Sequence, residues 1–224
     1  MTVLCSRIAL GFALGMLAGP VRADETPRPV RDHFGDPLPA GAVARLRTCG
    51  RVTAAALSRD GGTAFTAGDE GTIYRWDALT GRERGRYLGH KAEVVGLLLS
   101  PDGRTLFSQS KDNTLRAWDV DSGAQRWRRD GLNASGCRPA LSPDGKKLAA
   151  VSRPNVVELV EAATGERLHE LTAKSGGNIW AVAFTADASA VLAPMYYGPV
   201  CRWETAAGLR LPELVLPPGP KLYL

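Results

Sequence analysis

The chain has 224 residues, of which 44% are hydrophobic and 23% are charged, as in an ordinary soluble globular protein of one or two domains. This composition argues against a disordered chain, which would be poor in apolar residues. The formal net charge of +5 is weak, so it gives no reason to expect a nucleic-acid-binding protein, which usually carries a dense basic patch or stripe.

Residues 1–23 are predicted to be a secretory signal peptide. Arg7 precedes an apolar run from Ile8 to Ala18, and Val21-Arg22-Ala23 places small residues before a cleavage site at Asp24. The run is shorter than the roughly 20 residues that cross a membrane as a helix, and retention as a signal anchor is the alternative. We therefore expect export to the periplasm or the extracellular space. The mature chain would lose two of the 28 basic residues and no acidic one, which leaves a formal charge of +3.

The next two segments precede a repeated pattern. Residues 24–40 are rich in proline and charge without periodicity, which is typical of an extended linker. Residues 41–48 contain a short alternating run, Ala42 to Arg47, that favours a single strand. Because it precedes the first repeat, it stands where an N-terminal closing strand, which joins the two ends of a ring of repeats, would be expected.

Three landmarks then recur with steps of 42, 42 and 43 residues. A turn appears as Ser58-Arg59-Asp60-Gly61, Ser100-Pro101-Asp102-Gly103, Ser142-Pro143-Asp144-Gly145 and the degraded Thr185-Ala186-Asp187-Ala188. A closing pair appears as Trp76-Asp77, Trp118-Asp119, Val160-Glu161 and Trp203-Glu204. A hairpin glycine follows each pair, at Gly81, Gly123, Gly165 and Gly208, where a tight turn needs positive φ. The period predicts four repeats, at about 49–90, 91–132, 133–174 and 175–216, followed by a proline-rich tail at 217–224.

Each repeat is predicted to hold four strands. In the second repeat they are expected at residues 93–99, 105–109, 114–119 and 124–129, where short β-type runs lie between the turns. No apolar stripe of helical period is long enough for a helix outside the signal segment. The mature chain is therefore expected to be almost entirely β.

The second repeat carries a specific motif. Gly89-His90 opens it, Ser110 and Asp112 follow, and Trp118-Asp119 closes it. This motif resembles the WD40 family, whose repeats form the blades of β-propellers. The resemblance implies an all-β propeller in which His90, Ser110, Asp112 and Trp118 form a structural hydrogen-bonded network. Such groups can satisfy one another inside an apolar blade, because imidazole and hydroxyl both donate and accept.

The other repeats depart from this pattern. The first has Gly68 and Glu70 at the hydroxyl and aspartate positions, the third has Pro154 and Val160 at the aspartate and tryptophan positions, and the fourth has Met195 and Tyr197 at the hydroxyl and aspartate positions. Propellers have about four to eight blades. Each of the four repeats here already contains its own fourth strand, so the strand at 41–48 is not needed to complete any of these blades. We therefore expect an open or incomplete ring that self-associates, is completed by another propeller segment, or is unstable.

Catalytic and metal-binding patterns are not evident. His33, His90 and His169 are far apart in this architecture, so no metal site is expected, and no cofactor motif is found. The Asp119–Gly123 stretch resembles the start of a calcium loop, but Asp130 stands where the loop needs glutamate, which favours a hairpin. Cys49, Cys137 and Cys201 are odd in number and fit no metal spacing, which favours buried thiols over a disulfide.

The partner-binding residues that we expect are Tyr196, Tyr197, Trp180, Lys111 and Glu93. The tyrosines fall between the second and third strands of the last repeat, on the face where WD40 propellers bind partners, and aromatic residues are enriched at interfaces. Burial is the alternative for these aromatic residues. The sequence thus predicts an exported, non-catalytic scaffold that binds a protein or peptide, with no nucleic acid and no membrane span after signal removal. A propeller enzyme of quinoprotein-like or hydrolase type, or a fragment of a longer propeller without independent function, is the alternative.

Overall fold

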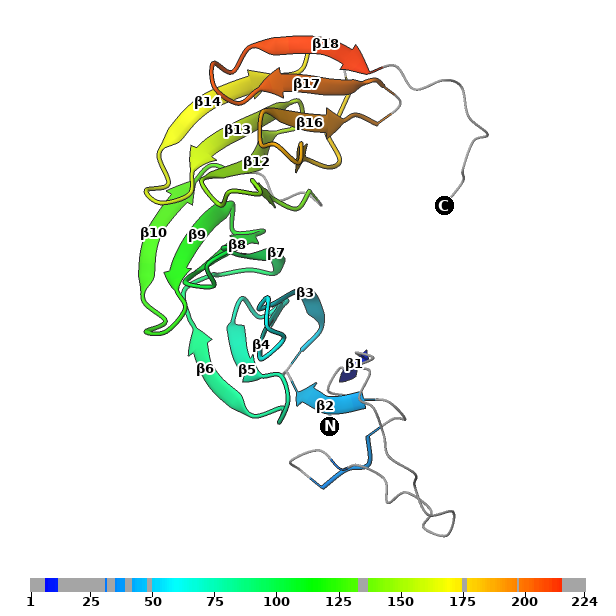
Figure 1. Ribbon diagram of the computed structural model, residues 1–224, viewed down its shortest axis with the longest axis vertical. Coiled ribbons are helices and arrows are strands. Elements are labelled where there is room, and N and C mark those ends of the chain that lie inside the picture. The colour runs from blue at the N-terminus through cyan, green and yellow to red at the C-terminus, as the bar shows by residue number, and fades with distance from the viewer. Residues whose placement is uncertain are drawn as a thin grey trace, which may run out of the picture.

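The computed structural model describes residues 7–11, 31, 35–38, 42–47, 50–132, 137–174, 177–196 and 198–214. In these ranges the secondary structure consists of strands, with no helix. Four antiparallel sheets of four strands stand side by side as an open arc (Figure 1). The fold is therefore an all-β propeller of four blades in which the ring is open, as the repeat pattern predicts.

Each blade is a meander in which successive strands pair antiparallel. Blade 1 consists of β3 (Val52–Leu57), β4 (Thr63–Gly68), β5 (Ile73–Asp77) and β6 (Glu83–Tyr87). Blade 2 consists of β7 (Val94–Leu99), β8 (Thr105–Ser110), β9 (Thr114–Asp119) and β10 (Gln125–Asp130). Blade 3 consists of β11 (Ala140–Leu141), β12 (Lys147–Arg153), β13 (Val156–Glu161) and β14 (Arg167–Thr172). Blade 4 consists of β15 (Ala183–Phe184), β16 (Ala190–Pro194), β17 (Val200–Glu204) and β18 (Arg210–Leu214).

The same pair of side chains builds the first turn of every blade. A Ser or Thr hydroxyl donates to an aspartate two residues later at 2.5 to 2.6 Å, in the pairs Ser58–Asp60, Ser100–Asp102, Ser142–Asp144 and Thr185–Asp187. These hydrogen bonds lower the pKa of each aspartate. The degraded fourth turn keeps this geometry because Ala188 adopts a positive φ of 58°, close to the 72° to 73° of its glycine counterparts. The left-handed conformation costs a non-glycine residue about 1 to 2 kcal/mol, so this turn is strained.

Apolar side chains join the blades face to face in three clusters. Phe65, Ile73, Leu106 and Trp118 lie between blades 1 and 2. Phe107, Leu115, Leu148 and Val160 lie between blades 2 and 3, and Val151, Leu159, Val191 and Trp203 lie between blades 3 and 4. All twelve are buried, and a fully buried side chain of this size stabilises a fold by about 1.5 to 3 kcal/mol. The central strands therefore bury apolar side chains on both faces.

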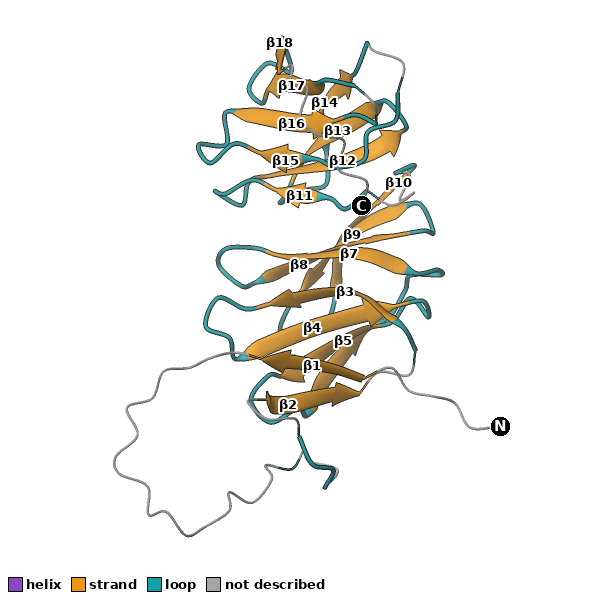
Figure 2. Ribbon diagram, turned by 90° about the vertical axis from the view of Figure 1, so that its right-hand side faces the viewer, coloured by secondary structure: helices purple, strands orange, loops and turns teal. Residues whose placement is uncertain are grey.

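The predicted strand at the N-terminal end is present as β2 (Ala42–Arg47). It pairs antiparallel with β1 (Arg7–Gly11) and belongs to none of the four blades. Leu46 packs with Ala64, Tyr74 and Trp76 on the face of blade 1 that lies away from blade 2, and Figure 2 shows the two strands beneath this blade. β1 falls inside the segment predicted to be removed on export, and that removal stays a prediction.

Candidate functional site

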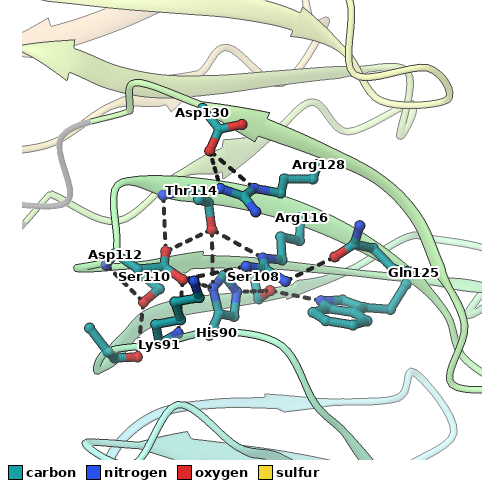
Figure 3. A network of polar contacts seen from close by, with 12 residues as sticks. His90, Lys91, Ser108, Ser110, Asp112, Thr114, Arg116, Gln125, Arg128 and Asp130 are labelled. Atoms are coloured by element: carbon teal, nitrogen blue, oxygen red, sulfur yellow. Dashed lines mark hydrogen bonds and ion pairs between the residues drawn. The ribbon is translucent and has the colours of Figure 1, made fainter.

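A buried polar network lies inside blade 2 (Figure 3). His90 stands in the connection between β6 and β7, and its side chain is 0% exposed. Its Nε2 lies 2.7 Å from the Ser108 hydroxyl, which also accepts a hydrogen bond of 2.8 Å from the indole N–H of Trp118. Ser108 therefore bridges the imidazole and the indole. A neutral imidazole that carries its proton on Nδ1 satisfies all of these groups.

Asp112 anchors the other side of the imidazole. Its Oδ2 lies 3.0 Å from His90 Nδ1 and accepts the backbone N–H of Lys91 at 3.0 Å. Its Oδ1 accepts the hydroxyl and the backbone N–H of Thr114 at 2.7 and 3.0 Å. Arg116 lies 3.6 Å from the carboxylate and donates to the Thr114 hydroxyl at 3.1 Å. The network thus ties the connection before β7 to β8 and β9.

The pKa values of Asp112 and His90 decide which of the two is charged at neutral pH. Burial raises the pKa of Asp112, but hydrogen bonds from Thr114, Lys91 and His90 outweigh it and lower that pKa to about 2. Burial lowers the pKa of His90 from 6.5, and Asp112 offsets this shift only in part. Asp112 is therefore ionised and His90 is neutral. Because both ring nitrogens are engaged within the blade, this histidine serves as a structural residue.

The prediction that Ser110 is the hydroxyl of this network is wrong, because Ser108 fills that place. Trp118 pairs with Leu106 across the strands, Arg116 pairs with Ser108, and Thr114 pairs with Ser110. Ser108 is thus one same-face position nearer to the indole. Ser110 donates instead to the carbonyl of Ala92 at 2.9 Å and accepts the N–H of Asp112 at 3.1 Å, which shapes the turn.

The bridging role of Ser108 could have been predicted from the repeat. Thr66 stands 42 residues earlier, and its hydroxyl accepts the indole N–H of Trp76 at 2.7 Å in blade 1. In the same blade Glu70, at the aspartate position, accepts the hydroxyl of Tyr74 at 2.7 Å. Blade 3 has fully buried Ala150 and Val160 at the hydroxyl and tryptophan positions. Apolar packing therefore replaces the bridge where the pair is lost.

Lys111 and Glu93, both predicted to bind a partner, pair with each other. Lys111 Nζ lies 2.6 Å from the Glu93 carboxylate, and Arg51 lies 3.3 Å from it. These residues lie where the blade-to-blade connections and the turns between second and third strands meet, which we call the strand-end face. A hollow of about 320 Å³ opens beside them and is lined by Thr53 and Arg138 as well as Arg51 and Glu93. This part of the face is strongly charged.

Trp180 and Tyr196 form an aromatic pair on the same face, at blade 4. Their ring centroids lie 6.3 Å apart, and the two residues are 53% and 57% exposed. Backbone hydrogen bonds place them, because Trp180 N–H donates to the Pro194 carbonyl at 3.3 Å and Tyr196 N–H donates to the Asn178 carbonyl at 2.9 Å. The alternative that they are buried is therefore wrong. Tyr197 lies outside the described residues. The structure brings Trp180 to Tyr196 in blade 4, while Lys111 and Glu93 lie in blade 2.

The other histidine, cysteine and aspartate side chains that the sequence singles out make local contacts or are buried where the structure describes them. His169 Nε2 lies 3.0 Å from the Ala206 carbonyl. Cys137 and Cys201 are buried, and burial raises the pKa of the Cys137 thiol to about 11. Asp119 accepts from Ser122 and Arg126 within its hairpin at 2.8 and 2.7 Å. Across the described ranges, no group of three or more His, Cys, Asp or Glu residues could hold a metal ion. His33 and Cys49 lie outside these ranges.

The fold and its repeats define a β-propeller protein. The chain belongs to the family whose model is described as outer membrane protein assembly factor BamB, and the match covers residues 41–191, about two thirds of the 224 residues. The matched region runs from β2 into β16 of blade 4. No curated protein matches the chain. In its described part, no helix is long and apolar enough to cross a membrane.

Proposed function

We propose that this chain is an exported, non-catalytic propeller scaffold that binds a protein or peptide through its strand-end face. The observation that carries the proposal is the pair Trp180 and Tyr196, which are more than half exposed and lie in ring contact. Aromatic side chains with a polar tip supply large contact area at protein interfaces. The charged group of Arg51, Glu93 and Lys111 adds polar contacts on the same face.

The family supports this function. The matching model carries the name of an outer membrane assembly factor, which suggests a partner among proteins that pass through the periplasm. We propose export through the N-terminal segment, with cleavage after Ala23, and repeats of the WD40 type, because the second repeat keeps His90, Asp112 and Trp118 in one network. The proposed function involves no cofactor and no metal.

The test compares partner retention by matched variants. Wild-type chain and the Trp180→Ala/Tyr196→Ala double variant are immobilised and exposed to the exported-protein fraction of the source cell. We expect the wild type to retain a discrete partner and the double variant to lose most of it. Leu79→Ala is the control, because Leu79 is 68% exposed in the hairpin between β5 and β6, at the opposite end of the strands. Equal retention by all three chains would contradict the proposal.

A further inference from the structure

The charged hollow of about 320 Å³ on the strand-end face is built by three blades. The side chains that line it are Arg51, Val52 and Thr53 at the start of blade 1, Glu93 and Val95 at the start of blade 2, and Arg138 at the start of blade 3. The segments that lead into the inner strands therefore meet here. Residues that are far apart in the chain share one hollow, and most of its wall is polar or charged.

Glu93 is the carboxylate among the lining residues, and both of its oxygens are engaged. Its Oε2 lies 2.6 Å from Lys111 Nζ, and its Oε1 lies 3.3 Å from Arg51 Nη2. Lys111 thus neutralises Glu93 at close range, while Arg51 makes a longer contact and keeps 67% of its side chain exposed. Asp69 does not line the hollow, and its carboxylate accepts the backbone N–H of Arg51 at 3.2 Å. The Arg51 guanidinium is therefore open to a further acceptor.

Arg138 reaches from blade 3 to blade 1. It is exposed, and its Nη2 donates to the Thr53 carbonyl at 3.4 Å, which is longer than the usual N–H···O distance. Within the described ranges no ion pair joins it to a carboxylate. A guanidinium has five N–H donors and no acceptor, so most of this capacity is unused. Blades 1 and 2 have Ala54 and Gly96 at the same repeat position, so the fold itself does not require an arginine here.

We infer that the hollow binds the carboxylate of an acidic side chain on the partner, between the guanidiniums of Arg51 and Arg138. This site deepens the proposed function, on which its role in the cell rests, because it gives the partner an acidic segment. The planar fork of arginine fits a carboxylate with paired, charge-assisted hydrogen bonds.

The charges of the hollow select this ligand over others. A cation is disfavoured because the two arginines only donate hydrogen bonds and Lys111 already occupies Glu93. Two lining guanidiniums against one lining carboxylate leave a single positive charge. That charge matches a carboxylate, which carries one negative charge, better than a phosphate group, which carries nearly two at neutral pH.

The probe that tests the site is a fluorescein-labelled polyglutamate peptide. Its binding to the full chain is measured by fluorescence anisotropy at low ionic strength, where charge interactions are least screened. We expect polyglutamate to bind and a polyglutamine peptide of the same length not to bind. Arg51→Gln and Arg138→Gln should each weaken binding by about tenfold or more, because each removes charge-assisted hydrogen bonds.

Arg84→Gln is the matched control, because it removes the same charge from a side chain that is 58% exposed and pairs with Asp77 in a hairpin at the opposite end of the strands. It should change binding by less than about twofold. If Arg84→Gln weakens binding as much as Arg138→Gln, the overall charge of the chain attracts the peptide and the inference is overturned. Polyglutamate that does not bind the wild type would overturn it as well.

Glu93→Gln supplies a result that a folding defect cannot imitate. It removes the carboxylate that competes for Arg51, so polyglutamate should bind about threefold more tightly or better. Weaker binding by Glu93→Gln would contradict the assignment. Inorganic phosphate and acetate are compared as competitors. Acetate should displace the peptide at the lower concentration, and the reverse order would overturn the inference in favour of a phosphate ligand.

The partner-retention assay separates this site from the proposed function. Arg138→Gln should lower retention of the partner, as Trp180→Ala/Tyr196→Ala does. Full retention by Arg138→Gln together with loss by the aromatic double variant would overturn the inference and leave the proposed function standing. Equal retention by every chain, with polyglutamate binding that still depends on Arg138, would refute the proposed function and leave the carboxylate site.

Discussion

The indole N–H of Trp118 donates a hydrogen bond of 2.8 Å to the hydroxyl of Ser108 in the interior of blade 2, where Ser108 is 0% exposed. The same hydroxyl lies 2.7 Å from His90 Nε2. Loss of this hydroxyl would leave an indole N–H and an imidazole nitrogen buried without partners. An unsatisfied buried group costs more than its hydrogen bond contributes, so Ser108 is the member on which most of the network depends.

Ser108→Ala is therefore expected to lower the free energy of unfolding by about 2 to 4 kcal/mol, because two buried polar groups lose their partner. Ser110→Ala is the matched control and should cost only about 1 kcal/mol, since the partners of its hydroxyl, the Ala92 carbonyl and the Asp112 N–H, belong to half-buried residues. Urea denaturation of the whole chain, followed by tryptophan fluorescence, measures both. A larger loss for Ser110→Ala would show that Ser108 is not the bridge.

Asp112→Ala should lower the free energy of unfolding by about 1 to 3 kcal/mol, because His90, Thr114 and the Lys91 N–H lose an acceptor. Glu70→Ala removes the corresponding carboxylate of blade 1, which is exposed and bonded to Tyr74. That change should cost less than about 1 kcal/mol. Equal and negligible losses at both positions would show that the network contributes nothing to stability.

The stability of the chain should fall as the pH is lowered through 6.5. Burial lowers the pKa of His90 below 6.5, so the unfolded chain binds a proton that the folded chain does not. Asp112 acts in a lower window: its pKa falls from 3.8 to about 2, so its contribution is lost only as the pH drops below about 4. His90→Gln should flatten the dependence between about pH 7.5 and pH 5.5. The midpoint of urea denaturation, measured across this pH range for the wild type and His90→Gln, tests the prediction. The same pH dependence in both proteins would show that His90 is not the group responsible.

Much of the fold could be predicted because its signals are local. The Ser–Asp turns and the hairpin glycines set strand ends within a few residues of chain, so the strands of blade 2 lie within one residue of the predicted ones. The inner strands β11 and β15 are shorter than the repeat suggests, with two residues each. Pro139 directly precedes β11 and has no N–H to donate to a neighbouring strand, so β11 cannot extend through it as a regular strand. The repeat period alone does not predict this shortening.

The candidate site was harder to predict because it depends on packing across strands. Ser108 and Ser110 lie on the same side of β8, so alternation cannot choose between them, and the cross-strand register decides. The exposure of Trp180 and Tyr196 depends on what covers blade 4, which no local pattern encodes.

Export should remove the first 23 residues. The order of Arg7, an apolar run and Val21-Arg22-Ala23 predicts cleavage between Ala23 and Asp24. N-terminal sequencing of the exported protein measures the cleavage site directly, and a mature protein that begins at Met1 would contradict the prediction. Cleavage would also separate β1 from β2, so the uncleaved and cleaved chains should differ in hydrogen exchange at residues 42–47.

Gly165→Ala should destabilise the chain more than Gly123→Ala, although both glycines occupy the same turn position with φ of 77° and 74°. A Cβ at Gly165 would lie 2.7 Å from Trp127, whereas at Gly123 the nearest atom is 3.7 Å away. Both changes cost about 1 to 2 kcal/mol for the left-handed backbone. Gly165→Ala must in addition displace Trp127, which donates to the Ala162 carbonyl at 3.0 Å and joins blades 2 and 3, at a further cost of about 1 to 3 kcal/mol. In a Trp127→Ala background the two glycine changes should cost the same in urea denaturation, and a persistent difference would place the steric conflict elsewhere.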